Sequence, residues 1–555
     1  MFFAGFGLYL TTLSPTVSFW DSGELISAAC NLGITHQPGY PLFSLVGRIF
    51  AFIPIGSIAF RVNVLSAAFS ALTIYLVYRI ILAVLCRKGE LSGKGCGVPV
   101  FLSASLALVL GCIRVFWSQA VVAEVYALNS FFIALLILLY VRAQGGEGAP
   151  ARYFMLSGFV AGLGIINHMS LVLYLPTLAL TWLLLPVDGG IHARLRNMVL
   201  GAALMLLGLS VYMYLPIRAA TGAVPDIGHP DTWRQFLWVI KWGDYVRNIG
   251  GLEASFVSLV KKINFFDVRI ILVVPAAVYF YWRLIRDDWR LFLPLIIFLV
   301  LYSAGISAQV LGGEREAKFG LQAKFYIPVF MVNVIFIGAL AKSMFRTLGG
   351  RYIELAVGST YGFLALALLY YNYVPNDSSR NFMAADYAQN SLKSAGQDGV
   401  LFTWGDNGIF PLWYIQQAER YRDDVVLVHA PLLTYDWYLD DVKEALGGKV
   451  DFIDPYFLGE NVFRILKAAK GARPVAYDYS SMRFLKLDET RLHNRGLVYF
   501  EGSVPTGDPW PTYVFRGMDA PGVFKGPMEQ NIIEIYRHQW KVSGQASSPG
   551  SGKGP

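Results

Sequence analysis

Long apolar blocks separated by short polar stretches dominate the first two thirds of the chain. Most of these blocks approach the length of roughly 20 residues that a helix needs to cross the hydrocarbon core of a bilayer. The pattern therefore predicts a polytopic α-helical membrane protein with about eleven transmembrane helices. The blocks lie at residues 1–14, 62–86, 98–116, 122–141, 153–168, 170–185, 198–216, 269–285, 291–309, 325–342 and 352–373.

The apolar stretch 45–60 is different, because Pro54 and Gly56 interrupt it. Proline and glycine disfavour a continuous helix, so we expect an interfacial or re-entrant helix there rather than a span.

The pattern changes after about residue 375. Strand-like runs at 399–405, 424–433, 473–480 and 496–502 alternate with helical spacing at 410–421 and 436–448. Such alternation predicts a small α/β domain. We therefore divide the chain into a transmembrane domain at 1–375, an α/β domain at 376–540, and a tail at 541–555 that is rich in Gly, Ser and Pro and predicted to be disordered.

Composition and charge place the chain in a membrane. It has 555 residues, of which 55% are hydrophobic and only 15% charged, with a net charge of +8. Much of the positive charge lies in short loops between apolar blocks, where Lys and Arg set topology, so we do not expect nucleic-acid binding. The loops that we assign to the cytoplasm contain Arg87, Lys88, Lys94, Arg152, Arg194, Arg196, Arg283, Arg286, Arg290, Lys342, Arg346 and Arg351. The opposite loops and the α/β domain are then extracytoplasmic.

The stretch FWDSGELISAA at 19–29 places Asp21 and Glu24 beside the first apolar block. An Asp followed three residues later by a Glu, before an apolar run, is the pattern of a helix capping box. The same carboxylates, in the first extracytoplasmic loop, are also candidate catalytic acids. The residues alone leave both interpretations open.

The turn that follows, ITHQPGYPLF, strengthens the functional interpretation. Its prolines and glycine block a helix and present His36 and Tyr40. Asn63 then stands at the start of the next span. Polar residues gathered at span ends on one side of a membrane often line a site, although interfacial anchoring explains Tyr40 equally well.

A second candidate region is VFWSQAVVAEVYALN at 115–129. Trp117 and Tyr126 fit an interfacial aromatic belt. Glu124 does not fit such a belt, and a carboxylate at membrane depth is a functional candidate because its burial is costly. The alternative is a first-turn Glu that complements the helix dipole.

Four further segments that carry polar candidate residues lie on the same predicted face of the membrane. Three of these segments are the turn at 166–176, YLPIRAATG at 214–222 and the loop at 312–328. The fourth segment is TWGDNGIF in the α/β domain. In the last segment Asp406 and Asn407 follow a strand, where a ligand could bind or an Asx turn could form. The candidates from the first three loops are Asn167, His168, Arg218, Arg315 and Lys324.

Carboxylates and cations around one membrane face suit transfer of a sugar from a polyprenyl phosphate. An acceptor hydroxyl must lose a proton, so a carboxylate base is needed. A lipid phosphate leaves, so Arg or Lys must stabilise its negative charge. The lipid tail requires a groove among spans that opens to the bilayer.

These residues also carry a family resemblance. The segments WDSGELISAA, LGITHQPGYPLF, RVNVLSA, FWSQAVVAEVYALN and YLPIRAA, with GDNGIFPLWYIQ in the α/β domain, resemble the GT-C superfamily of polyprenol-dependent glycosyltransferases. The resemblance is to the bacterial branch related to the protein O-mannosyltransferase family of transmembrane protein 260. One departure is Gln37, where the family pattern has proline.

The resemblance implies an enzyme and roles for its residues. It implies Asp21 as the catalytic base, with Glu24 and Glu124 assisting, and an inverting displacement at the anomeric carbon. The donor is a polyprenyl-phosphate-linked, mannose-like sugar, and the acceptor is a hydroxyl of an extracytoplasmic protein. His36 and Tyr40 shape the substrate pocket, and the remaining substrate-binding candidates are Asn63, Asn167, His168, Arg218, Arg315 and Lys324. No ligand set requires a cofactor, although a divalent metal is possible in this superfamily.

Three alternatives remain at this stage. The same chemistry could act on lipid A or another envelope glycan. A lipid-linked sugar flippase would place charges near the bilayer midplane in repeated halves, which the chain lacks. An assembly protein would not need Asp21 or Glu124. We expect a multi-pass protein of a bacterial inner membrane with an extracytoplasmic site.

Overall fold

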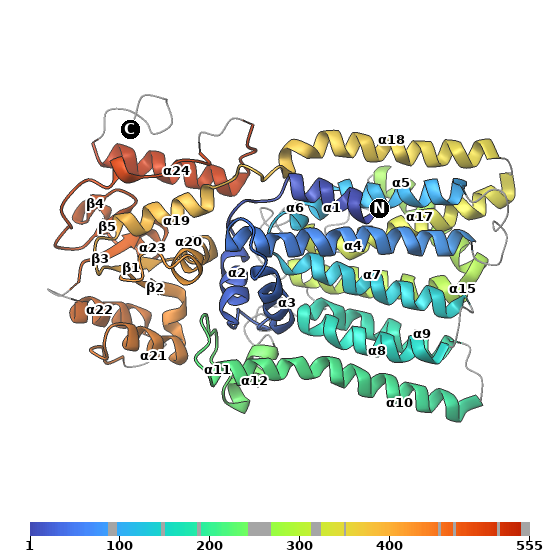
Figure 1. Cartoon of the computed structure of the whole chain (residues 1–555), viewed down its shortest axis with the longest axis horizontal. Coiled ribbons are helices and arrows are strands. Elements are labelled where there is room, and N and C mark those ends of the chain that lie inside the picture. Colours follow the sequence, from blue (N-terminus) through green and yellow to red (C-terminus); the bar gives the residue numbers. More distant parts are fainter. Residues whose placement is uncertain are drawn as a thin grey trace.

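The structure is a computed structural model of the chain. It describes residues 1–86, 97–145, 150–185, 190–241, 268–311, 323–348, 351–452, 457–469, 473–518 and 522–544. A long bundle of helices forms one half of the molecule, and a mixed α/β domain sits at one end of this bundle (Figure 1). The short helices α2 (Ser22–Asn31) and α3 (Pro41–Ala51) lie between the two parts.

The bundle is built from apolar helices that run in nearly the same direction (Figure 1). It also contains short 3-10 turns at Met169–Tyr174 (η2), Ser210–Met213 (η3) and Ala323–Tyr326 (η5). Its α-helices are α1 (Phe2–Thr11), α4 (Ile58–Cys86), α5 (Gly97–Cys112), α6 (Arg114–Ala120), α7 (Val125–Gln144), α8 (Pro150–Asn167), α9 (Leu175–Leu184), α10 (Gly190–Leu209), α11 (Tyr214–Ala219), α12 (Trp233–Ile240), α15 (Val268–Leu311), α17 (Ile327–Leu348) and α18 (Arg351–Asn376).

The polytopic prediction is confirmed, whereas the number of eleven spans stays a prediction. Within the described residues six helices are long and apolar enough to cross a membrane, or seven if α5 and α6, bent by 72° to each other, form one span. Four apolar helices are shorter, at 10–17 residues. The predicted blocks 269–285 and 291–309 both fall in α15, which is broken at Asp288 by a non-helical backbone (φ −157°, ψ 79°).

Small residues allow neighbouring helices to approach closely. A Cβ atom on Gly158 of α8 would lie 2.1 Å from the carbonyl oxygen of Gly201 on α10. Further along the same pair of helices, a Cβ atom on Gly162 of α8 would lie 3.0 Å from the Cα atom of Gly208 on α10. Membrane helices associate through such small-residue stripes because the bilayer supplies little hydrophobic drive between them. The interrupted stretch 45–60 contains the end of α3 and the start of α4 rather than a span, as expected.

Trp117 corrects one sequence-based interpretation. It does not belong to an interfacial belt, because it is fully buried and its indole Nε1 donates a hydrogen bond of 2.9 Å to the Thr12 hydroxyl. Tyr126 is also buried. The Trp117 ring packs against Tyr9 of α1, whereas the Tyr126 ring packs against His168 and Phe325.

The α/β domain has a five-stranded sheet in the order β2-β1-β3-β5-β4. The strands β2, β1 and β3 are parallel to one another, whereas β5 pairs antiparallel with both β3 and β4. The strands are β1 (Val400–Thr403), β2 (Val426–His429), β3 (Val475–Asp478), β4 (His493–Arg495) and β5 (Val498–Phe500). The sequence predicted all of these strands except β4, and it also predicted the helices that follow β1 and β2.

Helices cover both faces of this sheet (Figure 1). Alternate side chains of a strand point to opposite faces. Val400 and Phe402 pack with α21 (Asp436–Ala445) and α22 (Leu458–Ala469), and Leu401 packs with α19 (Met383–Ser394) and α24 (Pro527–Val542). α20 (Asp406–Trp413), which continues into the π-turn η6 (Tyr414–Ala418), follows β1, and α23 (Tyr479–Phe484) follows β3.

The α/β domain contacts the bundle through α2. A Cβ atom on Gly23 would lie 2.1 Å from the carbonyl oxygen of Phe410 in α20, so α20 lies directly on the backbone of α2. A second contact joins His229, in the loop before α12, to Asp441 of α21, with 3.1 Å between Nε2 and Oδ1. The domain is thus placed next to the predicted site.

Candidate functional site

The first loop does not use its two acids as a capping box. Asp21 is the residue before α2, but its side chain makes no capping hydrogen bond. Glu24 is fully buried, and its carboxylate faces the turn that follows α2. There Oε1 accepts a hydrogen bond of 2.5 Å from the backbone N–H of His36, and Oε2 lies 2.5 Å from the His36 Nδ1. The capping interpretation is therefore wrong, and Glu24 instead positions His36.

The HQPGYP turn holds its aromatic rings against each other. The backbone is left-handed at Gly39 (φ 88°) and at Tyr40 (φ 38°), the residue that precedes α3. This reversal brings the Tyr40 ring edge-on to His36, with ring centroids 5.2 Å apart. Burial lowers the pKa of His36, but the Glu24 carboxylate outweighs this effect and raises the pKa to about 10. His36 is therefore a cation at neutral pH.

Lys324 joins two acids that come from distant parts of the sequence. Its Nζ lies 3.3 Å from Glu124 Oε1 and 3.9 Å from Asp21 Oδ2. It also lies 4.7 Å from the centre of the Tyr126 ring, which is a favourable cation–π distance. Glu124 is only 4% exposed, and its Oε2 has no hydrogen-bond partner among the described residues.

His168 completes an aromatic wall beside Lys324. Its ring centroid is 5.3 Å from that of Tyr126, 6.4 Å from that of Tyr40 and 6.2 Å from that of Phe325. The backbone N–H of Ser170 donates to its Nδ1, so the neutral ring carries its proton on Nε2. The wall lies where α3, α7, η2 and η5 meet.

The α/β domain contributes a further acid to this cluster. The Asn407 side chain accepts a hydrogen bond of 2.7 Å from the backbone N–H of Trp20, the residue before Asp21. Asp406 is reached by solvent, yet the protein surrounding it and the charge of Asp21 raise its pKa to about 6. Asn407 therefore ties two domains together, where the sequence suggested an Asx turn.

The structure thus brings together seven of the predicted residues and adds neighbours to them. The seven are Asp21, Glu24, His36, Tyr40, Glu124, His168 and Lys324, in which Glu24 holds His36 and Glu124 holds Lys324. The sequence pointed to Tyr126 only as a belt residue and gave no signal for Phe325. The contacts of Tyr126 and Phe325 depend on which loops the fold brings together, and the sequence does not show this.

Asn63 and Asn167 instead support the backbone in this structure. Asn63 donates hydrogen bonds to the carbonyl oxygens of Ser14 and Thr16, at 2.9 and 3.1 Å. Asn167 donates a hydrogen bond of 3.2 Å to the carbonyl oxygen of Val125. Their amide donors are directed to the main chain, and their role as substrate ligands stays a prediction.

Arg218 lies away from the acidic cluster. It donates hydrogen bonds to the carbonyl oxygens of Leu32 (2.8 Å) and Asn31 (3.3 Å), at the end of α2 opposite to Asp21. A helix of this length separates the two ends by about 15 Å. Arg218 therefore caps α2. Arg315 lies outside the described residues.

Metal dependence stays a prediction. Within the described ranges no group of three or more His, Cys, Asp or Glu side chains has a geometry that could hold a metal ion.

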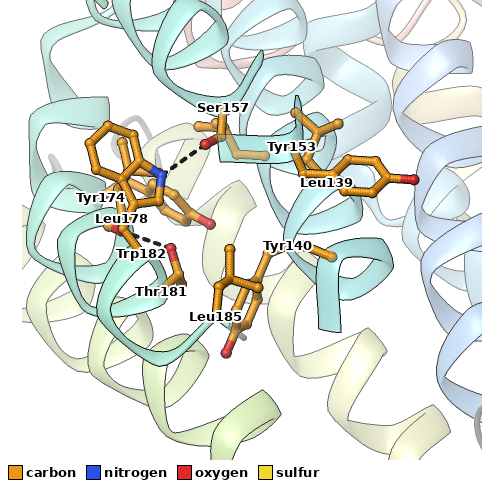
Figure 2. Close-up of a pocket in the computed structure, with 11 residues that line it drawn as sticks. Leu139, Tyr140, Tyr153, Ser157, Tyr174, Leu178, Thr181, Trp182 and Leu185 are labelled. Atoms are coloured by element: carbon orange, nitrogen blue, oxygen red, sulfur yellow. Dashed lines mark hydrogen bonds between the residues drawn. The ribbon is translucent and has the colours of Figure 1, made fainter. Parts of the chain in front are cut away.

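A separate pocket lies at the other end of the same helices. Tyr140 of α7, Tyr153 and Ser157 of α8, and Trp182 of α9 line it, and the Trp182 indole donates to the Ser157 hydroxyl at 3.0 Å (Figure 2). Tyr140 is about 24 Å along α7 from Glu124, at 1.5 Å per residue. This pocket is therefore not part of the acidic cluster.

Two domains of a known family match the chain. The N-terminal domain of the protein O-mannosyl-transferase TMEM260 matches residues 21–187, and the TMEM260-associated domain 2 matches residues 384–448. The first match begins at Asp21 and includes Glu124 and His168. The second includes Asp406.

Curated relatives agree with these matches. The protein O-mannosyl-transferase TMEM260 of Mus musculus is 29% identical over 460 residues, which cover 80% of this chain and 63% of the mouse protein. The corresponding protein of Dictyostelium discoideum is 25% identical over 487 residues, 78% of this chain and 56% of its own length. The chain therefore spans less than two thirds of either relative.

Solved structures with the same fold are also known. ArnT from Cupriavidus metallidurans, in the apo state, has a TM-score of 0.54 at 12% identity, covering 90% of this chain and 97% of that chain. An oligosaccharyltransferase of Archaeoglobus fulgidus has a TM-score of 0.50 at 12% identity, covering 92% of this chain and 73% of that chain. Taken together, these findings show that the chain is a multi-pass membrane protein with an ArnT-like fold, and that two of its segments are similar to domains of the TMEM260 protein O-mannosyl-transferases.

Proposed function

We propose that the protein transfers a mannose-like sugar from a polyprenyl-phosphate donor to a Ser or Thr hydroxyl of extracytoplasmic proteins. The observation that carries the proposal is the contact of Lys324 with both Asp21 and Glu124 at one end of the bundle. The related mouse and Dictyostelium proteins are named as protein O-mannosyl-transferases, which supports the same reaction.

Asp21 is the group best suited to act as the base. Its side chain is 24% exposed and its contact with Lys324, at 3.9 Å, is loose, so a substrate can reach it. Glu124 is held more closely by Lys324, and Glu24 is occupied by His36. A general base must lie within hydrogen-bond reach of the proton that it removes, and of the three acids Asp21 leaves most room for that.

The proposed step is a displacement with inversion at the anomeric carbon. The acceptor oxygen attacks this carbon on the face opposite the phosphate, while its proton passes to Asp21. The bond from the anomeric carbon to the phosphate oxygen breaks, and the electron pair remains on the phosphate. Lys324 stabilises the charge that develops there, because a fixed cation binds the leaving phosphate, which gains a second negative charge, more strongly than the singly charged phosphodiester of the donor.

The experiment compares wild type, Asp21→Asn and the control Asp231→Asn, an exposed acid in the loop before α12. Each is expressed in a strain that lacks the native protein, and membrane levels are matched by immunoblot. Intact masses of extracytoplasmic proteins are then recorded. We expect wild type and Asp231→Asn to add hexose-sized increments. The loss of a general base costs about 10²–10⁴-fold in rate, so Asp21→Asn should add none that can be detected.

Two outcomes contradict the proposal in different ways. If Asp21→Asn restores the increments as well as wild type does, Asp21 is not the base. If wild type adds no mass to any protein, the acceptor is not a protein, and lipid and glycan fractions of the envelope become the substrates to measure.

A further inference from the structure

The charged groups of the cluster fall into two pairs and two remaining acids. Glu24 is paired with His36, and Glu124 with Lys324. Asp21 is only loosely engaged, at 3.9 Å from Lys324. Asp406, from the α/β domain, has no hydrogen-bond or ion-pair partner among the residues that the structure describes.

Asp406 occupies a position where α/β sheets bind ligands. It follows β1, whose two parallel neighbours are β2 and β3. The chain leaves β1 toward β2 on one side and later returns to β3 on the other, which makes the carboxyl end of β1 a topological switch point. Gly405, with φ of 76°, turns the chain there, and the adjacent Asn407 binds the backbone of Trp20. The switch point of the sheet is thus fixed against the loop that holds Asp21.

The electrostatics of this position distinguish between the two substrates. Burial and the neighbouring Asp21 carboxylate both raise the pKa of Asp406, so the two acids share one region of negative potential. Negative potential disfavours a lipid phosphate and attracts hydrogen-bond donors and cations. A phosphate donor therefore suits the Lys324 side of the cluster. An acceptor that enters from the α/β domain side meets Asp406, which belongs to that domain and is more exposed than Asp21.

We propose that Asp406 binds the acceptor and selects acceptor segments that carry a Lys or Arg beside the target Ser or Thr. The proposal rests on the proposed function, and it assigns the α/β domain a specificity-determining residue within the reaction centre. A carboxylate only accepts hydrogen bonds, and a bond to a charged donor is the strongest that it forms. Asp406 would therefore discriminate among protein acceptors, while Asp21 carries out proton removal.

The test uses the full-length protein in lipid nanodiscs and three synthetic peptides. The peptides are identical except for Lys, Ala or Glu next to the target residue, and binding is measured with the target Ser replaced by Ala so that no transfer occurs. The variants are Asp406→Asn, Asp406→Glu and the control Asp423→Asn. Asp423 is exposed and precedes β2, at the opposite edge of the sheet.

We expect wild type and Asp423→Asn to bind the Lys peptide about tenfold more tightly than the Glu peptide, the ratio typical of one charge-assisted hydrogen bond. Asp406→Asn should lose this ratio, and Asp406→Glu should retain part of it. Reactive peptides then separate binding from chemistry. Asp406→Asn should raise the KM for the Lys peptide severalfold with kcat little changed, whereas Asp21→Asn should lower kcat.

The proposal is wrong if wild type binds the three peptides equally, or if Asp406→Asn keeps the preference of wild type. Failure of the proposed function has a different signature. In that case the peptides bind with the expected preference but wild type transfers no sugar to them. A thermal unfolding curve for each variant in the same nanodiscs confirms that the comparison is between folded proteins.

Discussion

Replacing Lys324 with methionine removes the cation that neutralises two acids at the end of the bundle. Methionine keeps most of the length and the apolar stem of lysine, so packing against Tyr126 changes little. Lys324 is 19% exposed and Glu124 is 4% exposed, so little water can replace the lost charge. The variant should therefore be less stable than the wild type.

The magnitude follows from the two distances. At an effective dielectric constant of about 20, opposite unit charges attract by about 5 kcal/mol at the 3.3 Å between Lys324 and Glu124, and by about 4 kcal/mol at the 3.9 Å to Asp21. Desolvation of the ions offsets much of this attraction. Removal of one partner of a buried pair typically costs about 3–5 kcal/mol, because the other charge remains buried alone. We expect about 3 kcal/mol for Lys324→Met, since Glu124 can then bind a proton.

The assay is a double-mutant cycle with Lys324→Met and Glu124→Gln, with unfolding followed by tryptophan fluorescence in detergent. The double variant should recover at least about 1.5 kcal/mol relative to the sum of the single variants, because neither buried charge is then left alone. The control Lys443→Met breaks a pair with Asp451 in which the side chains are 42% and 90% exposed, and it should change stability by less than about 0.5 kcal/mol. Additivity within about 0.5 kcal/mol at Lys324 and Glu124 would refute the reasoning.

Three other predictions concern the frame of the site. Gly23→Ala should reduce stability and activity together, since its Cβ would meet the Phe410 carbonyl oxygen, whereas Gly7→Ala meets nothing within 4 Å and should be neutral in thermal unfolding. Arg218→Ala should lower the unfolding midpoint and leave the KM for the donor unchanged. A large rise in that KM would instead indicate that Arg218 binds the donor phosphate. The His36 cation is stabilised in the fold, so its contribution should be complete below about pH 6.5 and be lost as pH rises toward 10. Unfolding midpoints measured from pH 6 to pH 10 should therefore fall more steeply in wild type than in His36→Gln.

Local patterns in the sequence were sufficient for the element types. Apolar blocks near the length of a span became bundle helices, because a long apolar helix satisfies its own backbone and has no stable alternative in a bilayer. Short runs rich in Val, Leu, Phe and Tyr became β1, β2, β3 and β5. β4, with the sequence His-Asn-Arg, was missed because its side chains carry no strand signal and its pairing with β5 alone defines it.

Local patterns did not predict the hydrogen-bond partner of a side chain where that partner is distant in the sequence. Asp21 and Glu24 match a capping box, but Glu24 reaches His36, which offers both a backbone N–H and an imidazole. Arg218 has the chemistry of a phosphate ligand, and in this structure its Nε and one terminal nitrogen donate to the carbonyl oxygens at the end of α2, so its phosphate role stays a prediction. In each case a motif of four to nine residues cannot show which partner lies nearby.

The sequence by itself determined that the chain is a membrane protein with an α/β domain, and it predicted that acids and cations gather in loops on one side. Those properties depend on hydropathy and spacing, which are local. Only the tertiary structure decided that Lys324 lies between Asp21 and Glu124, and that Asp406 comes next to them from the α/β domain. The physical reason is that Coulomb attraction and hydrogen bonding act over a few ångströms, and the packing of helices hundreds of residues apart sets those distances.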